Sequence, residues 1–235
     1  MTMLDDQVVL ITGAGRGVGA AIAKLFALQG ATIAANDITP INLDKVVESI
    51  AATGAHAKSY VHDISKKMPV QALINAIIND WGRLDIVINA ASVNPKSDIL
   101  SLDAWDWQRA LDVNLTGTFL VTQSAGRIMQ GREGGTIINI AANYSSDHKA
   151  AYITSKTGII GLTQESAREL KPYNIRINAI CSGCVVNTGE LSNNSAQVQE
   201  ALSQAALFLC SQEASQISGQ IIDINDQDSW HTYTQ

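Results

Sequence analysis

Short apolar segments alternate with longer amphipathic segments along almost the whole chain. The apolar segments are rich in β-branched residues and lack a polar alternation, which is typical of strands buried on both faces of a parallel sheet. They predict strands at residues 8–11, 32–35, 58–61, 86–89, 136–140, 176–181 and 221–224. The amphipathic segments predict helices at 17–29, 41–53, 68–81, 102–129, 152–170 and 197–210. This series predicts an α/β fold with a doubly wound, parallel, seven-stranded sheet and helices on both faces.

Length and composition fit a single domain. The 235 residues contain 46% hydrophobic and 16% charged residues, and no linker or repeat divides them, so we expect one domain over residues 1–235 with a polar tail at 227–235. The net charge is −6 and the largest basic cluster is Lys66-Lys67, which argues against a nucleic-acid partner. The acidic start and the absence of a long apolar run predict a cytoplasmic protein that does not bind membranes.

The three cysteines are an odd number and fit a reducing compartment better than a disulfide framework. Cys181 and Cys184 form a C-x-x-C pair that could be a redox pair or half of a zinc site. No second Cys/His pair accompanies them, so we expect two small residues around a turn and no metal.

A glycine-rich turn follows the first predicted strand. Gly13, Gly15, Gly17 and Gly19 lie between this strand and a helix, with Arg16 and Val18 among them. Glycine lets the chain turn tightly and brings backbone N–H groups close to a pyrophosphate at the helix N-terminus. The alternative is an ordinary turn, but the acid at the end of the second strand favours a dinucleotide site.

That acid is Asp37, 18 residues after Gly19, where a carboxylate can bind the adenosine ribose. It would repel a 2′-phosphate, so we expect NAD rather than NADP, although Arg16 could meet such a phosphate and Ile38 adds no second positive charge. Helix capping is the alternative role for Asp37. Asp63, just after the third strand, can contact the adenine edge or cap a helix.

Tyr152 and Lys156 stand four residues apart, on one face of a predicted helix. A nearby ammonium stabilises phenolate and lowers the tyrosine pKa, so Tyr152 can exchange a proton with an alcohol or carbonyl. Asn114 lies inside the predicted helix at 102–129, where asparagine is a poor helix former. It has either a functional amide, a kink or a hydrogen bond to another helix.

Together these motifs resemble the short-chain dehydrogenase/reductase family, in particular its 3-oxoacyl-[acyl-carrier-protein] reductase-like branch. The resemblance covers residues 6–226 and includes the segment 217–223. It implies a Rossmann-type sheet ordered 3-2-1-4-5-6-7 and a homo-oligomer, a dimer or more usually a tetramer. It further implies that Tyr152 is the general acid/base, that Lys156 binds the nicotinamide ribose and tunes the tyrosine, and that Asn114 holds a water. Implied cofactor contacts also include Ile38, Ile64, Asn89, Gly183 and Val185.

The chain departs from the family pattern in four places. Ala142 replaces the serine that orients the substrate oxygen, unless Asn143, Tyr144, Ser145 or Ser146 reaches the same space. Residues 89–92 read Asn-Ala-Ala-Ser instead of Asn-Asn-Ala-Gly, and Ser182-Gly183 replaces Pro-Gly, with Asn187 or Thr188 as the carboxamide-binding residue. Residues 189–196 are shorter than the usual substrate lid.

Two functions therefore remain as hypotheses. The first is an NAD(P)-dependent oxidoreductase that interconverts a secondary alcohol and a ketone, with Tyr152 as the proton donor. The alternative is a dinucleotide-binding homologue with impaired or no catalysis, which Ala142 and the short lid favour. Partner binding through Trp105 and Trp107 is a weaker third interpretation, because aromatic residues at a helix start usually pack into the core or an oligomer contact.

Overall fold

The computed structural model describes residues 2–142, 149–182, 196–224 and 230–232. For residues 230–232 it describes the backbone alone. Seven parallel strands form the sheet in the order β3-β2-β1-β4-β5-β6-β7, as predicted. Their bounds are β1 Val8–Thr12, β2 Thr32–Asp37, β3 Ala57–Val61, β4 Ile86–Asn89, β5 Gly135–Ala141, β6 Ile175–Ser182 and β7 Ile221–Ile224. In β1 and β4 every residue is buried, which explains their unbroken apolar sequences.

The structure adds one strand that the sequence did not predict. β8, Trp230–Thr232, pairs antiparallel with β7 and becomes the edge of the sheet. It lies within the segment that we expected to be a polar tail. Three residues are too few to show a periodic pattern, and the pairing is provided by the open edge of β7.

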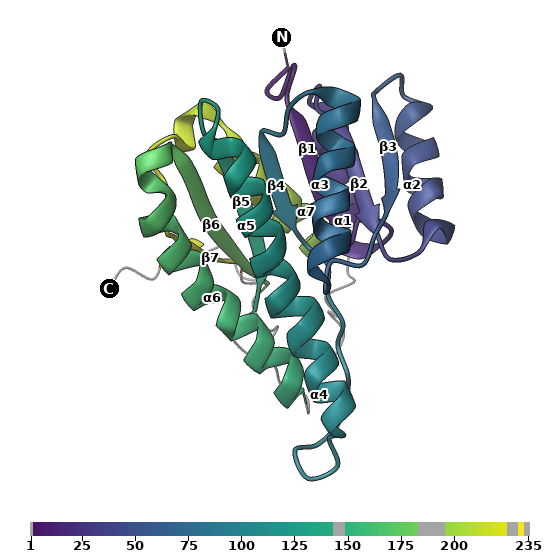
Figure 1. Ribbon diagram of the computed structural model, residues 1–235, viewed down its shortest axis with the longest axis vertical. Helices are drawn as coiled ribbons and strands as arrows, with labels where there is room; N and C mark the ends of the chain where they lie inside the picture. The colour runs from purple at the N-terminus through teal and green to yellow at the C-terminus, as the bar shows by residue number, and fades with distance from the viewer. Residues whose placement is uncertain (1, 143–148, 183–195, 225–229, 233–235) are drawn as a thin grey trace.

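Helices cover both faces of the sheet (Figure 1). One face packs against α1 (Gly17–Leu28), α2 (Pro40–Ala51) and α7 (Ala196–Cys210), which contribute buried residues such as Phe26, Leu43 and Leu202. The other face packs against α3 (Lys67–Trp81), α5 (Gly117–Gln130) and α6 (Ala150–Leu170). Two short 3-10 helices, Lys171–Tyr173 and Gln212–Ala214, precede β6 and β7. Among the described residues, no helix is long and apolar enough to cross a membrane.

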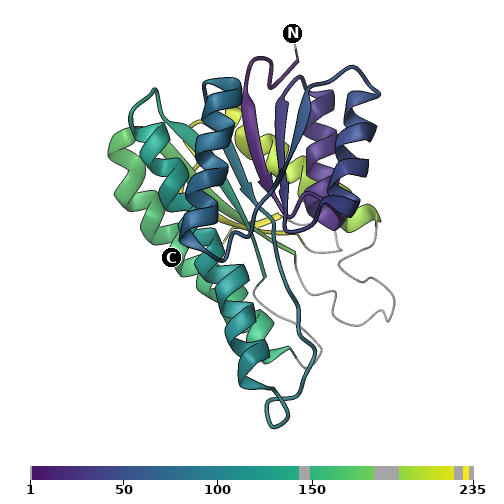
Figure 2. The ribbon, with the colours of Figure 1, turned by 45° about the vertical axis from the view of Figure 1, so that its right-hand side comes forward.

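The helix predicted at 102–129 is divided into three parts. α4 (Ala104–Ala110) continues into a π-helical turn, Leu111–Thr116, and then into α5. α4 and the start of α6 lie side by side and extend beyond the carboxyl edge of the sheet (Figures 1 and 2). Isolated π-turns are uncommon and are frequent at functional sites, which directs attention to Asn114 at the middle of this turn.

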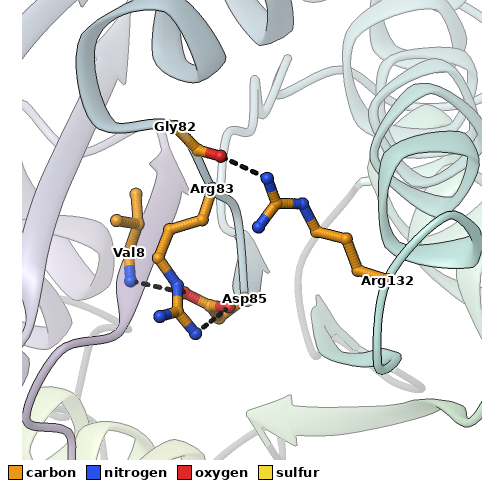
Figure 3. Close-up of polar contacts among 5 residues, drawn as sticks. All are labelled: Val8, Gly82, Arg83, Asp85 and Arg132. Atoms are coloured by element: carbon orange, nitrogen blue, oxygen red, sulfur yellow. Dashed lines mark hydrogen bonds and ion pairs between the residues drawn. The ribbon is translucent and has the colours of Figure 1, made fainter.

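The amino edge of the sheet has its own polar cluster (Figure 3). The Oδ2 atom of Asp85 accepts the main-chain N–H of Val8 at 2.8 Å, and Arg83 donates to both carboxylate oxygens at 2.8 and 2.9 Å. Arg132 donates to the carbonyl of Gly82. These bonds align the starts of β1 and β4 at the edge opposite the candidate site.

Candidate active site

The turn between β1 and α1 is closely packed and needs glycine. Gly13 has a φ of +68°, and a Cβ atom there would lie 2.6 Å from Cα of Ala91. A Cβ at Gly19 would lie 2.3 Å from the carbonyl oxygen of Gly13. A Cβ atom cannot approach another atom this closely. Glycine at these two positions therefore lets the turn pack against the loop after β4 and against the start of α1.

The start of α1 presents unpaired backbone donors. The first-turn N–H groups, from Gly17, Val18 and Gly19, have no acceptor within the helix. Arg16 is exposed at the N-cap position and makes no side-chain capping bond, and the first turn contains no acidic residue. The helix dipole adds partial positive charge here, so the turn suits an anion such as a pyrophosphate.

Thr12 joins this turn to the loop after β4. Its buried hydroxyl oxygen accepts the N–H groups of Ala90 at 3.1 Å and Ala91 at 3.2 Å. The sequence motif begins at Thr12, but this contact spans 78 residues of chain and was not among our predictions. It fixes the glycine-rich turn relative to β4, which is the neighbouring strand of the sheet.

Asp37 ends β2 beside the same turn. Its Oδ2 atom accepts the N–H of Gly15 at 3.0 Å, and its Oδ1 atom accepts the N–H of Ile38 at 2.7 Å. Ile38 is 63% exposed. The carboxylate is therefore oriented by backbone donors, and its placement beside the turn fits the predicted adenosine ribose site.

Asp63 and Ile64 follow β3. The Oδ1 atom of Asp63 accepts the N–H of Ser65 at 2.9 Å, a local turn contact that precedes α3 rather than a helix cap. Ile64 is buried, and its Cδ1 would be 2.9 Å from a Cβ atom at Gly117 on α5. Asn36 holds the end of β3 in place by donating to the carbonyls of Tyr60 and His62 at 2.9 and 3.1 Å.

Asn89, at the end of β4, is 2% exposed and its amide nitrogen bonds within the interior. It donates to Oδ1 of Asn139 at 2.8 Å and to the hydroxyl of Thr122 at 3.2 Å. Asn139 in turn donates to Thr163 at 2.9 Å. These amide contacts join β4 and β5 to α5 and α6 beneath the carboxyl edge of the sheet.

Tyr152 and Lys156 lie on the buried face of α6. Tyr152 is 8% exposed and Lys156 is 2% exposed. The Nζ atom of Lys156 donates to the carbonyl oxygen of Ile140 at 2.7 Å and lies 6.0 Å from the centroid of the Tyr152 ring. Burial lowers the pKa of this amine from 10.5 to about 8, and the nearby Cys181 opposes the shift. A phenol and a cation thus meet at the end of β5.

Asn114 connects three elements from within the π-turn. Its Oδ1 atom accepts the N–H of Val93 at 2.8 Å, and Nδ2 donates to the Val93 carbonyl at 2.9 Å. Nδ2 also donates to the hydroxyl of Ser155 on α6 at 2.8 Å. Of the roles open to Asn114 from sequence, the structure shows both a helix irregularity and a bond to another helix. Ser155 is not among the site residues predicted from the sequence, although it lies between Tyr152 and Lys156 in the Y-x-x-x-K motif.

Ala142 directly follows β5 and is 2% exposed. Its methyl group can donate no hydrogen bond. The residues considered as substitutes, 143–146, lie outside the described residues, as do Gly183, Val185, Asn187, Thr188, Cys184 and the segment 189–195. Ser92, in the loop after β4, has a buried hydroxyl oxygen with no hydrogen-bond partner among the described residues.

The structure also shows the surroundings of Cys181 and Trp105. Cys181 is fully buried, and burial raises its thiol pKa to about 12, so it is a packed residue as expected. Within the described ranges no three His, Cys, Asp or Glu residues form a metal-type cluster. Trp105 does not pack into the core. Its side chain is 66% exposed, and the Cζ atom of Arg109 lies over its ring, 5.2 Å from the centroid.

The arrangement fits a nicotinamide dinucleotide. The glycine turn after β1 offers donors and no side-chain bulk to a pyrophosphate, and Asp37 lies beside it for a ribose. Lys156 and Tyr152 lie at the carboxyl end of β5, which is two strands from β1 in the same sheet. This edge is where doubly wound sheets bind such ligands.

Comparisons with known proteins agree with this geometry. Residues 7–199 match the family model described as short chain dehydrogenase. The 3-oxoacyl-[acyl-carrier-protein] reductase of Thermotoga maritima is 31% identical over 94% of this chain and 97% of its own. D-threitol dehydrogenase of Mycolicibacterium smegmatis is 36% identical over 75% of this chain and 69% of its own.

Solved structures give the same result. NAD⁺-bound xylitol dehydrogenase superposes with a TM-score of 0.85 at 28% identity, covering 95% of this chain and 98% of that one. A short chain dehydrogenase from Mycobacterium smegmatis gives a TM-score of 0.88 at 27% identity, with 97% and 95% coverage. The chain therefore belongs to the short-chain dehydrogenase family, in its 3-oxoacyl-[acyl-carrier-protein] reductase-like branch, and is an NAD(P)-dependent oxidoreductase.

Proposed function

We propose that the protein uses NAD to interconvert a secondary alcohol and a ketone, with Tyr152 as the general acid/base. The observation that carries this proposal is the buried Lys156 amine, 6.0 Å from the ring centroid of Tyr152. An ammonium at this position stabilises the phenolate and lowers the tyrosine pKa toward neutrality. Tyr152 then gives a proton to the carbonyl oxygen in reduction and takes one from the hydroxyl in oxidation.

Lys156 has donors left for a second task. An ammonium has three N–H groups, and one is used by the carbonyl of Ile140. We assign the others to the nicotinamide ribose, as the family resemblance implies. The bound nicotinamide supplies or accepts the hydride. Lys156 thus orients the cofactor and tunes the proton donor at the same time.

Asn114 is proposed to hold a water that relays protons. Both N–H groups of its amide are used by Val93 and Ser155. The water therefore bonds to an oxygen acceptor of Asn114, either on the amide or on the main chain. The bonded amide keeps that acceptor fixed beside Ser155 and Val93.

The preference for NAD rests on Asp37. Its carboxylate accepts hydrogen bonds from the N–H groups of Gly15 and Ile38, which hold it beside the glycine-rich turn. A 2′-phosphate brought to this position meets a fixed negative charge, whereas a 2′-hydroxyl finds an acceptor. Arg16, exposed at the turn, is the residue that would oppose this preference.

Ala142 sets the expected level of activity. Without a hydroxyl at this position, one donor that orients the substrate oxygen is missing, and losing such a donor costs about 10² to 10³ in rate. We therefore expect slow turnover. The alternative of a non-catalytic homologue is not favoured, because the relatives are named reductases and dehydrogenases.

The relatives' names define the substrates to try. They are a 3-oxoacyl thioester, an acyclic polyol such as threitol or xylitol, and borneol, a bicyclic secondary alcohol. Each is offered with NAD(H) and NADP(H), after cofactor affinity is measured by titration. Turnover that Tyr152→Phe abolishes supports the proposal.

The control is Tyr173→Phe, which removes the hydroxyl of a tyrosine that is 42% exposed in the short 3-10 helix after α6. It should leave turnover unchanged. Tight NADH binding with no turnover of any substrate by the wild type would instead support the non-catalytic alternative. We also propose a homo-oligomer formed through the helices that hold Asn114 and Tyr152, which light scattering after size-exclusion chromatography tests directly.

A further inference from the structure

Tyr152 stands on a helical turn that no N-cap side chain supports. α6 begins at Ala150, so Tyr152 lies in its first turn. Lys149, at the N-cap position, makes no side-chain capping bond, and the first turn contains no acidic residue to complement the helix dipole. Uncapped first turns fray readily. A bond from a neighbouring element would hold such a turn, and the catalytic phenol on it, in place.

Ser155 supplies the contact that the cap does not. Its side chain is fully buried. The hydroxyl donates to the carbonyl oxygen of Tyr152 at 2.7 Å and accepts from Nδ2 of Asn114 at 2.8 Å. One hydroxyl therefore bonds the first turn of α6 to the π-turn between α4 and α5. Close packing supports the contact, since a Cβ at Gly158 would lie 2.9 Å from Leu115.

The hydrogen-bonded path continues to the cofactor turn. Asn114 bonds both the N–H and the carbonyl of Val93 in the loop after β4. The same loop is bonded two residues earlier, where the N–H of Ala91 donates to Thr12 at 3.2 Å. Buried and part-buried hydrogen bonds therefore link the turn that contains Tyr152 to the glycine-rich turn.

We propose that Ser155 is a positioning residue, which holds the Tyr152 turn in register with the cofactor turn through Asn114. This inference rests on the proposed function for its kinetic consequence. It predicts that loss of the Ser155 hydroxyl lowers kcat, because the phenol is misaligned, while cofactor affinity and KM change little. A displacement of about 1 Å in a reacting group can cost up to 10² in rate.

α6 also contains a closely matched control, Thr163. Its hydroxyl is fully buried, donates to the carbonyl of Ile159 at 2.7 Å and accepts from Nδ2 of Asn139 at 2.9 Å. Ser155→Ala and Thr163→Ala thus each remove a buried hydroxyl and leave one amide donor unpaired. Thr163 lies two turns beyond the catalytic pair, so only Ser155→Ala should affect alignment.

The first measurement is steady-state kinetics on whichever substrate the wild type turns over. We expect Ser155→Ala to lower kcat about tenfold or more, with KM and the Kd for NADH within about twofold. We expect Thr163→Ala to keep kcat within about twofold. Equal losses in the two variants, or an unchanged kcat in Ser155→Ala, would overturn the inference.

The second measurement needs no turnover. Hydrogen–deuterium exchange should be faster in residues 150–156 of Ser155→Ala and faster around residue 163, but not in 150–156, of Thr163→Ala. If Ser155→Ala does not fold, Ser155→Cys keeps the volume with a weaker hydrogen-bonding group and should show the same change in milder form. Unchanged exchange at 150–156 would refute the role of Ser155, whereas an inactive wild type would refute only the proposed function.

Discussion

The carboxylate of Asp37 accepts the main-chain N–H of Gly15 at 3.0 Å, so the acid that we propose binds the ribose is bonded directly to the turn that we propose binds the pyrophosphate. The contact is possible because Gly15 has no side chain. A Cβ atom there would lie 2.8 Å from Oδ2 of Asp37. If Asp37 binds the ribose as proposed, the glycine at position 15 should affect cofactor selectivity as well as phosphate binding.

We predict that Gly15→Ala weakens NAD⁺ binding and narrows the preference for NAD⁺ over NADP⁺. The added methyl group displaces the carboxylate that should bind the 2′-hydroxyl and repel the 2′-phosphate. We expect the Kd for NAD⁺ to rise about tenfold, equivalent to one good hydrogen bond to a charged group, with a smaller change for NADP⁺. Fluorescence titration with both cofactors measures this.

Gly161→Ala is the matched control for that experiment. Gly161 lies in α6, and a Cβ atom there would meet nothing within 4 Å. Its substitution should leave both dissociation constants unchanged. Parallel weakening of NAD⁺ and NADP⁺ in Gly15→Ala would show that the methyl group disturbs only the phosphate turn.

Much of the fold could be predicted from the sequence, because the burial of strands and helices produces regular patterns of apolar residues. The strand predicted at 86–89 matches Ile86–Asn89, and the helix predicted at 197–210 differs from Ala196–Cys210 by one residue. The π-turn at Leu111–Thr116 left no such trace, since the apolar periodicity continues through it. Asn114, a poor helix former, was the one local signal.

The candidate site also contains some features that the sequence predicts and others that it does not. Tyr152 and Lys156 were found because helical spacing alone puts them on one face. The contact between Asn114 and Ser155 joins residues 41 positions apart and depends on how two helices cross, which no local pattern encodes. For Trp105 the sequence left burial in the core, an oligomer contact and an exposed position open, because the outcome depends on how far α4 extends past the sheet, and the side chain is exposed.

Ala142→Ser should increase turnover. The substitution returns a hydroxyl to the end of β5, where the family places the donor for the substrate oxygen. If the rest of the site is competent, kcat should rise by about 10-fold to 100-fold, which reaches the lower limit of the range of about 10² to 10³ seen for such donors. Ala141→Ser, at the neighbouring buried alanine within β5, is the control and should give no gain. An unchanged rate in Ala142→Ser would place the limitation elsewhere.

Ser92→Ala should stabilise the protein without cofactor. The Ser92 hydroxyl oxygen is buried and has no hydrogen-bond partner among the described residues, and an unpaired buried hydroxyl costs about 1–3 kcal/mol. We expect the free energy of unfolding in urea to rise by about 1 kcal/mol. Ser203→Ala is the comparison, because that buried hydroxyl donates to Gln199 at 2.6 Å and its removal should bring no gain. Destabilisation of Ser92→Ala would mean that the hydroxyl has a partner.

The stability difference between wild type and Lys156→Met should depend on pH. Burial lowers the pKa of Lys156 from its ordinary value of 10.5 to about 8 in the folded state, so the unfolded chain binds more protons between these pH values. Wild-type stability therefore rises with pH across this window relative to a variant that lacks the amine, by up to about 3 kcal/mol. Below pH 8 the buried charge is a cost, and Lys156→Met should be the more stable protein.

Urea unfolding at pH 7, 9 and 10 measures the difference, with Lys24→Met as the exposed control on α1, whose difference from wild type should stay constant. A difference for Lys156→Met that also stays constant across these pH values would show that Lys156 does not titrate in this range, and its charge would then have to be balanced in the folded protein by a group other than the Ile140 carbonyl.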